Sequence, residues 1–306
     1  MNPMDLRGLV PAPVTAFTSD GEVDHVANAD LARWLVSVDG VKGLVCLGHA
    51  GEGTYLTAEE QIALIRTLVE AVGDRVPIIA GITGEGTKTA ALEARRAADA
   101  GAVGALVYPS HGWLRFGFQP GAPQERYRAI HEESGLQCIL FQYPDVTKAT
   151  YDLSTQLEIA AQSGVVATKN GVRNMRRWDT EIPVLRENFP DLQILTCHDE
   201  YLLHTMFDVD GALVGYGGLA PEPLVELIAA GKAQDYARAR EIHDRLLPVT
   251  KAVYHRGSHM EGTVALKIGL RARGVLKDAT VRQPLQPLGE TAVAEVESAL
   301  QQAKLI

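Results

Sequence analysis

Short apolar runs alternate with segments of helical spacing about eight times along this 306-residue chain. Thr57 with Glu60 forms a capping-box pattern that opens one of the helical segments. Strands that alternate with helices pair in parallel, and eight such units in roughly 215 residues predict a closed (β/α)8 TIM barrel, an α/β fold. A doubly wound open sheet is the alternative, but its usual glycine-rich dinucleotide turn does not follow the first run. The runs lie near residues 8–17, 43–47, 76–80, 104–108, 137–142, 165–169, 192–196 and 211–215.

The alternation stops after residue 220. Only helical patterns follow, at about 223–230, 233–253, 261–273 and 288–304. Since no strand is left to pair, we assign residues 1–231 to the barrel with its last helix, and residues 232–306 to a C-terminal helical extension. Such an extension can pack beside the barrel or mediate assembly.

The composition, 46% hydrophobic and 22% charged, is that of a soluble globular protein with an ample core. A net charge of −9 argues against nucleic acid or an anionic membrane as a partner. No apolar run approaches the ~18 residues that span a bilayer, and the first residues lack the order of a signal peptide, so we expect a cytoplasmic protein. Cys46, Cys138 and Cys197 have no metal-binding spacing, and we interpret them as core residues.

One apolar, β-branched run ends in a lysine: residues 165–171 read VVATKNG. This is the pattern of a buried barrel strand that carries an amine at its C-terminal end. Burial lowers the pKa of an amine, so a lysine in this position can be neutral near pH 7 and attack a ketone, forming a Schiff base. The alternative is a surface lysine that is salt-bridged or that extends into solvent.

Polar residues and glycines follow several of the other predicted strands, which is where the site of a barrel forms. The turn LGHAGEG at 47–53 is rich in glycine, which lets backbone N–H groups point inward and bind an anion such as a substrate carboxylate. The alternative is an ordinary glycine-rich turn without a ligand, which has the same sequence pattern. His111 is a candidate acid/base group or an ordinary loop histidine. No cluster has the His, Cys and carboxylate spacing of a metal site.

Two acidic residues, Asp199 and Glu200, follow the seventh predicted strand. They are placed to bind substrate hydroxyls or to cap the next helix, and we expect at least one of them to cap. Glycines after the eighth strand would allow a close approach of backbone and ligand. The predicted substrate contacts at these strand ends are completed by Phe141, Gly171, Leu213 and Gly215.

Taken in order, these motifs resemble the dihydrodipicolinate synthase / N-acetylneuraminate lyase family of Schiff-base aldolases and dehydratases. The resemblance covers nearly the whole chain and rests on the order and spacing of its pieces. Family members have a helical C-terminal appendage and usually form tetramers, so the resemblance implies a homotetramer. The pieces are GLV through TAF at 8–17, GEVD at 21–24, GHAGE at 48–52, VPIIAG at 76–81, YP at 108–109, Pro144, the run to Lys169, and DGA at 210–212.

By this resemblance, Lys169 looks like the Schiff-base lysine, and the turn at His49 and Ala50 looks like the pocket for the keto-acid carboxylate. The family usually has two hydroxyl residues there, so this chain keeps the backbone donors and loses the hydroxyl contacts. Phe141 occupies the place of the family's proton-shuttling tyrosine, and phenylalanine cannot transfer a proton. The candidates to replace it are Tyr143, which lies two residues on and on the same strand face, and His111.

Three departures bear on the substrate. The synthase branch of the family carries an arginine just after the strand-five proline, where residues 145–147 of this chain read DVT, which argues against the lysine-biosynthesis synthase. The pair Asp199 and Glu200 resembles the sialic-acid-lyase pattern and favours a hydroxylated or sugar-derived keto acid. This chain lacks the strand-five tyrosine, and in this it resembles the family members that dehydrate 2-keto-3-deoxy sugar acids.

The resemblance therefore implies class I, metal-free lyase chemistry on a 2-keto acid, with no cofactor beyond the covalent Schiff base on Lys169. The expected reaction is a pyruvate-type aldol cleavage or condensation, and dehydration of a 2-keto-3-deoxy sugar acid is the alternative. A keto-acid-binding protein that has lost efficient turnover is a further alternative, motivated by the missing hydroxyls. A sugar-phosphate aldolase would need a phosphate cradle at Gly215, Gly217 and Gly218, where no basic residue stands beside them.

Overall fold

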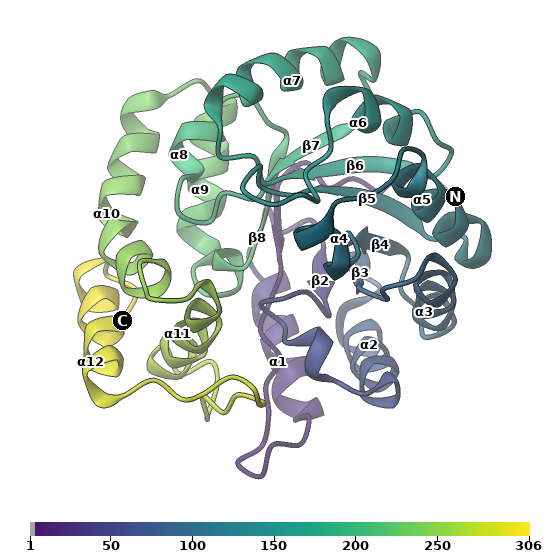
Figure 1. Cartoon of the computed structure of the whole chain (residues 1–306). Helices are drawn as coiled ribbons and strands as arrows, with labels where there is room; N and C mark the ends of the chain where they lie inside the picture. Colours follow the sequence, from purple (N-terminus) through teal and green to yellow (C-terminus); the bar gives the residue numbers. More distant parts are fainter. Residues whose placement is uncertain (1–3) are drawn as a thin grey trace.

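The computed structural model describes residues 4–306 and contains one sheet of eight parallel strands. The strands are hydrogen-bonded in the order β1-β8-β7-β6-β5-β4-β3-β2, and a parallel bridge between Leu9 and Val41 joins the first strand to the segment that leads into the second. The sheet is therefore closed, and the predicted TIM barrel is confirmed (Figure 1). The strands are β1 Leu9–Pro11, β2 Leu44–Cys46, β3 Ile78–Ile82, β4 Gly104–Val107, β5 Gln137–Gln142, β6 Val165–Asn170, β7 Gln193–Thr196 and β8 Gly211–Val214.

Helices cover the outside of the barrel and alternate with its strands (Figure 1). A short helix, α4 His111–Phe116, and two 3₁₀ turns, Gly53–Tyr55 and Tyr216–Gly218, lie in the loops after β4, β2 and β8. The surrounding helices are α1 His25–Val36, α2 Ala58–Val72, α3 Thr87–Asp99, α5 Ala122–Ser134, α6 Leu153–Ala160, α7 Met175–Asn188, α8 Leu202–Thr205 and α9 Pro221–Lys232. The extension consists of α10 Tyr236–Tyr254, α11 His259–Ala272 and α12 Glu290–Gln302.

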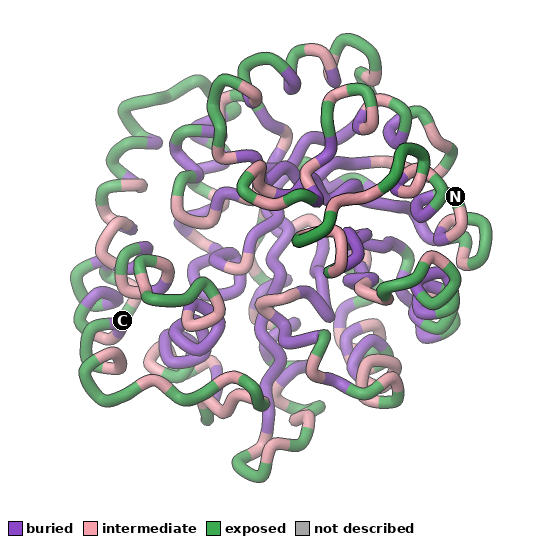
Figure 2. The backbone as a smooth tube through the Cα atoms, in the orientation of Figure 1, coloured by how far each residue is buried: buried purple, intermediate pink, exposed green. Residues whose placement is uncertain are grey.

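Helix α2 shows how local sequence fixes these elements. Thr57 Oγ1 accepts a hydrogen bond from the Glu60 N–H at 3.3 Å, and Glu60 Oε2 accepts one from the Thr57 N–H at 2.8 Å, so the predicted capping box is confirmed. Leu64, Ile65 and Leu68 form the buried stripe of this helix. Figure 2 shows the resulting pattern, with the strands buried and the outward faces of the helices exposed.

The inside of the barrel has its own apolar core, separate from the core between strands and helices. Side chains of a strand alternate between the two, so Ala167 points inward and Lys169, two residues on, points inward at the open end. The inner core includes Val10, Val45, Ile79, Leu106, Ile139, Ala167, Leu195 and Leu213.

One strand boundary differs from the sequence expectation. The first apolar run, predicted over 8–17, forms a strand only at Leu9–Pro11; the last ladder bond runs from the Ala12 N–H to the Val214 carbonyl, and Pro13, which has no N–H, follows it. Helix α9 ends at Lys232, next to residue 231, where we predicted the end of the barrel. Helices α10, α11 and α12 pack on one another, and α10 also packs against α9 and α8 of the barrel (Figure 1). Across residues 4–306, no helix has both the length and the apolar character needed to cross a membrane.

Candidate active site

A cavity of about 130 Å³ lies at the C-terminal ends of the strands and contains the side chain of Lys169. Six of the predicted site residues line it: His49, Ala50, Phe141, Lys169, Asp199 and Gly215. The sequence analysis did not identify its other lining residues as part of the site. These are Ala12, Tyr108, Cys197, Tyr254, His259, Met260, Thr263 and Leu266.

Lys169 is held in the middle of the barrel, between β5 and β7. Its backbone pairs with Phe141 on one side and with Leu195 on the other, and the residue is only 7% exposed. Its Nζ atom lies 4.1 Å from the centre of the Phe141 ring, which is a cation–π contact. No carboxylate of residues 4–306 forms an ion pair with this ammonium. The surface-lysine alternative is therefore wrong.

The charge of Lys169 differs from the sequence expectation. Burial lowers the pKa of its ammonium, but the negative forms of Cys197, Tyr108 and Asp199 outweigh burial, so the pKa lies above its ordinary value of 10.5. We expected burial to dominate, because the sequence did not show that three acidic groups surround the amine. The resting lysine is therefore protonated, and it must lose a proton before it can attack a carbonyl.

The glycine-rich turn after β2 forms the floor beside Lys169. It contains two non-glycine residues in the left-handed region, Leu47 at φ +61° and Glu52 at φ +54°. A Cβ at Gly53 would lie 2.1 Å from the carbonyl oxygen of Leu47, so only glycine fits there. Thr15, in the segment that follows β1, donates from Oγ1 to the Gly51 carbonyl at 2.6 Å and so holds the turn in place.

His49, at the tip of this turn, is a neutral imidazole. Burial and the nearby charges of Lys169 and His111 lower its pKa to about 4. Its backbone N–H donates to the Tyr108 hydroxyl oxygen at 3.3 Å, so one of the two predicted carboxylate donors already has a protein partner. Within the predicted pair, Ala50 also lines the cavity and carries the other backbone N–H.

The Tyr108 side chain is the clearest residue that sequence reasoning missed. It follows β4 directly, is 2% exposed, and packs edge-on against Phe141 with ring centres 5.1 Å apart. A Cβ at Gly48 would lie 2.9 Å from its hydroxyl oxygen, so the glycine of the turn makes room for it. Its position at the C-terminal end of a barrel strand was the available signal.

Tyr143 and His111, the two predicted proton relays, lie beside the cavity and do not line it. Tyr143 is buried, and its ring centre lies 4.6 Å from that of Phe141 and 6.5 Å from that of His49. His111 begins α4, where its Nδ1 atom lies 2.9 Å from Glu85 Oε1 and its ring stacks on His49 at 5.9 Å. Both roles stay predictions.

Asp199 and Glu200 do not cap the helix that follows, so that expectation is wrong. Helix α8 has no side-chain cap at its N-terminus. Asp199 Oδ1 instead accepts from the Tyr216 N–H and from the Tyr254 hydroxyl, both at 2.8 Å. Glu200 forms an ion pair with Arg173 at 3.3 Å and does not line the cavity.

Two more predicted contacts also lie outside the cavity, for identifiable reasons. The Gly171 N–H continues the ladder by donating to the Gln142 carbonyl at 2.8 Å, at the edge between β5 and β6. Leu213 is fully buried in the inner barrel core, because in β8 its side chain alternates inward. Of the β8 end, Gly215 alone lines the cavity.

The C-terminal extension supplies a whole wall of the cavity. Tyr254 ends α10, and His259, Met260, Thr263 and Leu266 lie on one side of α11. The Tyr254 and His259 rings stack with centres 5.8 Å apart. The spacing of the four α11 residues indicates one face of a helix, but the sequence did not show that this face covers the mouth of the barrel.

A buried ion pair joins the extension to the glycine-rich turn. The Lys267 ammonium contacts Glu52 Oε1 and donates to the Thr280 carbonyl at 2.7 Å, while Glu52 Oε2 accepts from the Arg282 N–H at 2.8 Å. Lys267 is 1% exposed and Glu52 is 0% exposed. Burial lowers the pKa of Lys267 to about 8, against the attraction of Glu52, so the ammonium keeps its proton at pH 7.

His198, next to the cavity residues Cys197 and Asp199, makes stability depend on pH. It is fully buried, its Nε2 donates to the Val172 carbonyl at 2.7 Å, and burial together with Arg173 lowers its pKa to about 4. The unfolded chain binds a proton near pH 6.5, whereas the folded chain binds it only near pH 4. The stability that this provides is present above pH 6.5 and is lost as the pH falls toward 4.

We therefore expect His198→Gln to flatten the acid limb of the stability curve. Between pH 7 and 4.5 the free energy of unfolding of the unchanged protein should fall by about 2 kcal/mol more than that of the variant. Urea unfolding at the two pH values measures this difference. The exposed His204→Gln serves as the control and should follow the unchanged protein. Equal losses in all three proteins would contradict the assignment.

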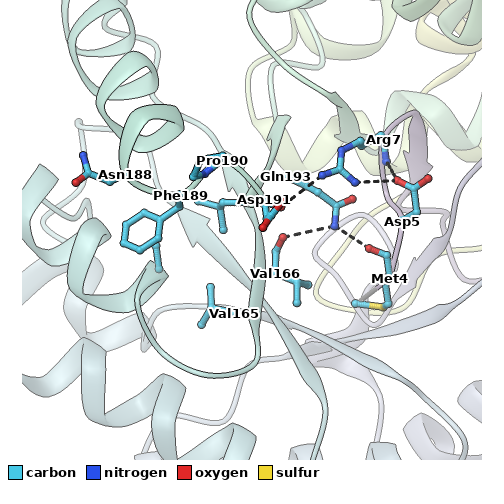
Figure 3. Close-up of a pocket in the computed structure, with 12 residues that line it drawn as sticks. Met4, Asp5, Arg7, Val165, Val166, Asn188, Phe189, Pro190, Asp191 and Gln193 are labelled. Atoms are coloured by element: carbon cyan, nitrogen blue, oxygen red, sulfur yellow. Dashed lines mark hydrogen bonds and ion pairs between the residues drawn. The ribbon is translucent and has the colours of Figure 1, made fainter. Parts of the chain in front are cut away.

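A second, larger cavity of about 670 Å³ lies at the opposite end of the barrel. Figure 3 shows it where β6 and β7 begin, next to the N-terminal segment. Its polar groups are satisfied by one another: Arg7 pairs with Asp5 at 3.4 Å, and Gln193 Nε2 donates to the Met4 carbonyl at 2.7 Å. Because barrel enzymes carry their chemistry at the C-terminal face, we assign the reaction to the smaller cavity.

No three His, Cys, Asp or Glu side chains of residues 4–306 are grouped to hold a metal ion.

Known proteins share both the sequence pattern and the fold. Residues 5–303 match the dihydrodipicolinate synthetase family. The chain is 31% identical to the 4-hydroxy-tetrahydrodipicolinate synthase of Kineococcus radiotolerans, over 97% of this chain and 93% of that one. It is 28% identical to YagE of Escherichia coli K12, whose name suggests a 2-dehydro-3-deoxy-D-gluconate aldolase, over 97% of each chain. The crystal structure of YagE with pyruvate matches with a TM-score of 0.87 at 26% identity, covering 98% of this chain and 99% of that one. This chain belongs to the dihydrodipicolinate synthetase family and is a lyase.

Proposed function

We propose that this lyase is a class I enzyme that forms a Schiff base between Lys169 and the C2 carbonyl of a 2-keto acid. The observation that carries the proposal is a lysine that forms no ion pair with a carboxylate of residues 4–306 and lies buried near the C-terminal end of β6, in a cavity lined by the strand ends and α11. Among the lining residues described in residues 4–306 it is the sole lysine or arginine. The pyruvate complex of the related YagE supports a keto acid of this type.

The reaction follows from the chemistry of the amine. After the ammonium of Lys169 releases a proton to solvent, the neutral amine attacks C2, and a proton moves from the nitrogen to the oxygen to give the carbinolamine. Its hydroxyl gains a further proton and leaves as water, and the nitrogen lone pair forms the C=N bond of the iminium. The iminium accepts the electron pair that is released when C3 loses a proton or when the C3–C4 bond breaks, giving an enamine. Adding an aldehyde to the enamine, followed by hydrolysis, is the aldol condensation, and the reverse is cleavage. No cofactor or metal takes part in this scheme.

The turn after β2 would hold the carboxylate of the keto acid. The Ala50 N–H would bind the carboxylate together with other backbone N–H groups of the turn. Because the turn already holds these groups in place, they need not reorganise when the anion binds. The wall from α11 would meet the distal end of the substrate with the hydroxyl of Thr263 and the imidazole of His259. A hydroxylated, sugar-derived keto acid fits this mixture of polar groups, and Asp199 adds an acceptor.

Dehydration of a 2-keto-3-deoxy sugar acid is the second candidate, favoured by the phenylalanine that faces the amine at 4.1 Å. The residues at 145–147 provide no arginine for the carboxylate of a second substrate, which supports a role other than lysine biosynthesis. Assembly as a homotetramer, which the family resemblance implies, and the cytoplasmic location expected from the sequence are part of the same proposal. A binding protein without turnover is the remaining alternative.

Borohydride trapping with pyruvate tests the proposal. We expect a reduced adduct on Lys169, located by peptide mass spectrometry, and no adduct in Lys169→Ala. The exposed Lys148→Ala is the control and should be trapped like the unchanged protein. If neither pyruvate nor a panel of longer keto acids leaves an adduct on Lys169, the class I reaction is wrong. Product analysis with 2-keto-3-deoxy sugar acids then separates cleavage, which releases pyruvate, from loss of water.

A further inference from the structure

Schiff-base chemistry at Lys169 requires a group that moves protons inside the cavity. The carbinolamine oxygen must gain a proton to leave as water, and C3 must lose one to give the enamine. The lining side chains with an exchangeable proton or a titratable group are His49, Tyr108, Cys197, Asp199, Tyr254, His259 and Thr263.

The groups near the extension are already engaged. Tyr254 donates its hydroxyl proton to Asp199, and Asp199 Oδ1 also accepts from the Tyr216 N–H. His259 stacks on Tyr254 and lies with Thr263 on the α11 wall. These residues belong to the part of the cavity that would hold the substrate's distal end.

Tyr108 lies on the other side, next to the amine. Its ring and that of Phe141 pack nearly perpendicular to each other with centres 5.1 Å apart, and the Lys169 ammonium lies over the Phe141 ring. The hydroxyl oxygen accepts the His49 N–H at 3.3 Å, in the turn proposed for the carboxylate. No group of residues 4–306 accepts the hydroxyl proton of Tyr108, so this proton is free for a molecule in the cavity.

The backbone that carries Tyr108 is fixed from behind. Arg126, fully buried in α5, donates from Nε to the Tyr108 carbonyl at 2.9 Å and from Nη2 to the Gly84 carbonyl at 2.7 Å. A buried guanidinium that satisfies two loop carbonyls holds the ends of β3 and β4 together. The Tyr108 hydroxyl is therefore positioned before any ligand binds.

We propose that Tyr108 is the catalytic proton-transfer residue of the Schiff-base reaction, an inference that rests on the proposed function. Its hydroxyl gives its proton to the carbinolamine oxygen, the C2–O bond breaks, and water leaves as the nitrogen lone pair forms the C=N bond. The phenolate then takes a proton from C3, and the C–H electron pair forms the C2=C3 bond as the C=N electrons return to nitrogen. The phenol is restored and the enamine is formed.

The charges in the cavity agree with this sequence of steps. Burial raises the pKa of Tyr108 and the positive charge of Lys169 opposes the increase, with a net rise above the ordinary value of 10.0. The hydroxyl is therefore protonated at rest and available as the acid for the first step. The iminium that forms next keeps a positive charge beside the phenolate, and this charge stabilises the phenolate until it takes the proton from C3.

Tyr108→Phe tests the inference by two separate readouts. Exchange of the pyruvate methyl protons in D2O, followed by NMR, should slow by about 100-fold or more, because C3 deprotonation loses its base. The borohydride adduct on Lys169 should still form on long incubation, because the amine is intact. Tyr151→Phe is the matched control: it also removes a hydroxyl from a fully buried ring, one that packs against Phe118 and does not line the cavity, and should exchange at close to the unchanged rate.

Two further variants sharpen the result. Phe141→Tyr added to Tyr108→Phe returns a hydroxyl to the same space from β5 and should restore part of the exchange. A larger loss in Tyr143→Phe than in Tyr108→Phe would assign the proton transfer to Tyr143 and overturn the inference. If Tyr108→Phe exchanges protons at the unchanged rate, this inference is wrong but the proposed function stands. If the unchanged protein forms no adduct, both the proposed function and this inference are wrong.

Discussion

Replacing Lys169 with methionine should lower turnover by at least ~10⁴-fold, since the nucleophile is removed and no other amine lines the cavity. The fold should survive the change. The ammonium is buried without a carboxylate partner, and a methionine of similar length would place its sulfur near the Phe141 ring. We therefore expect the variant to be as stable as the unchanged protein or more so, as is common when a buried charged group kept for function is removed.

Steady-state turnover of the best substrate and the thermal midpoint of unfolding measure the two effects together. The exposed Lys148→Met provides the control for losing one positive charge and should change neither. Residual turnover within tenfold of the unchanged protein would show that the Schiff base is not required. A drop in the midpoint comparable to that of a core cavity would show that Lys169 has a structural role.

The barrel could be predicted because its determinants are local. Alternating apolar runs and helical stripes report strand and helix positions directly, and eight repeats leave few ways to close a parallel sheet. The same rule placed His49, Phe141, Lys169, Asp199 and Gly215 at the strand ends, where five different strands bring them to one cavity. Strand lengths were less certain, as the prolines after Leu9 show.

Tyr108 and the α11 residues were missed for a physical reason: tertiary packing, which the spacing of residues along the sequence does not reveal, brings them to the cavity. Tyr108 follows β4 and packs next to Phe141, whereas we predicted Tyr143 or His111 as the replacement for the missing tyrosine. The α11 residues arrive from about 90 positions beyond Lys169, through packing of the extension. The pKa of Lys169 likewise depends on neighbours from other strands.

The largest loss of stability is expected where the extension meets the barrel. Lys267→Met leaves the carboxylate of Glu52 buried without its counter-charge, and breaking a buried pair in this way costs about 3–5 kcal/mol. The extension also carries the α11 wall of the cavity, so its loosening should raise KM for a long keto acid more than it slows proton exchange of pyruvate. A thermal or urea unfolding curve gives the first quantity, and kinetics with the two substrates give the second.

The double variant Glu52→Gln/Lys267→Met distinguishes a charge effect from a packing effect. Because it removes both charges, it should recover about 2 kcal/mol or more of what the single change loses. Glu60→Gln is the matched control at the same junction: Glu60 pairs with Arg282 at 2.7 Å but is partly exposed, and its loss should cost about 1 kcal/mol. If the double variant is as unstable as the sum of its single changes, the pair is not coupled. The contact between α11 and the turn would then depend on the packing of Lys267 against Phe17, whose ring centre lies 4.3 Å from the ammonium.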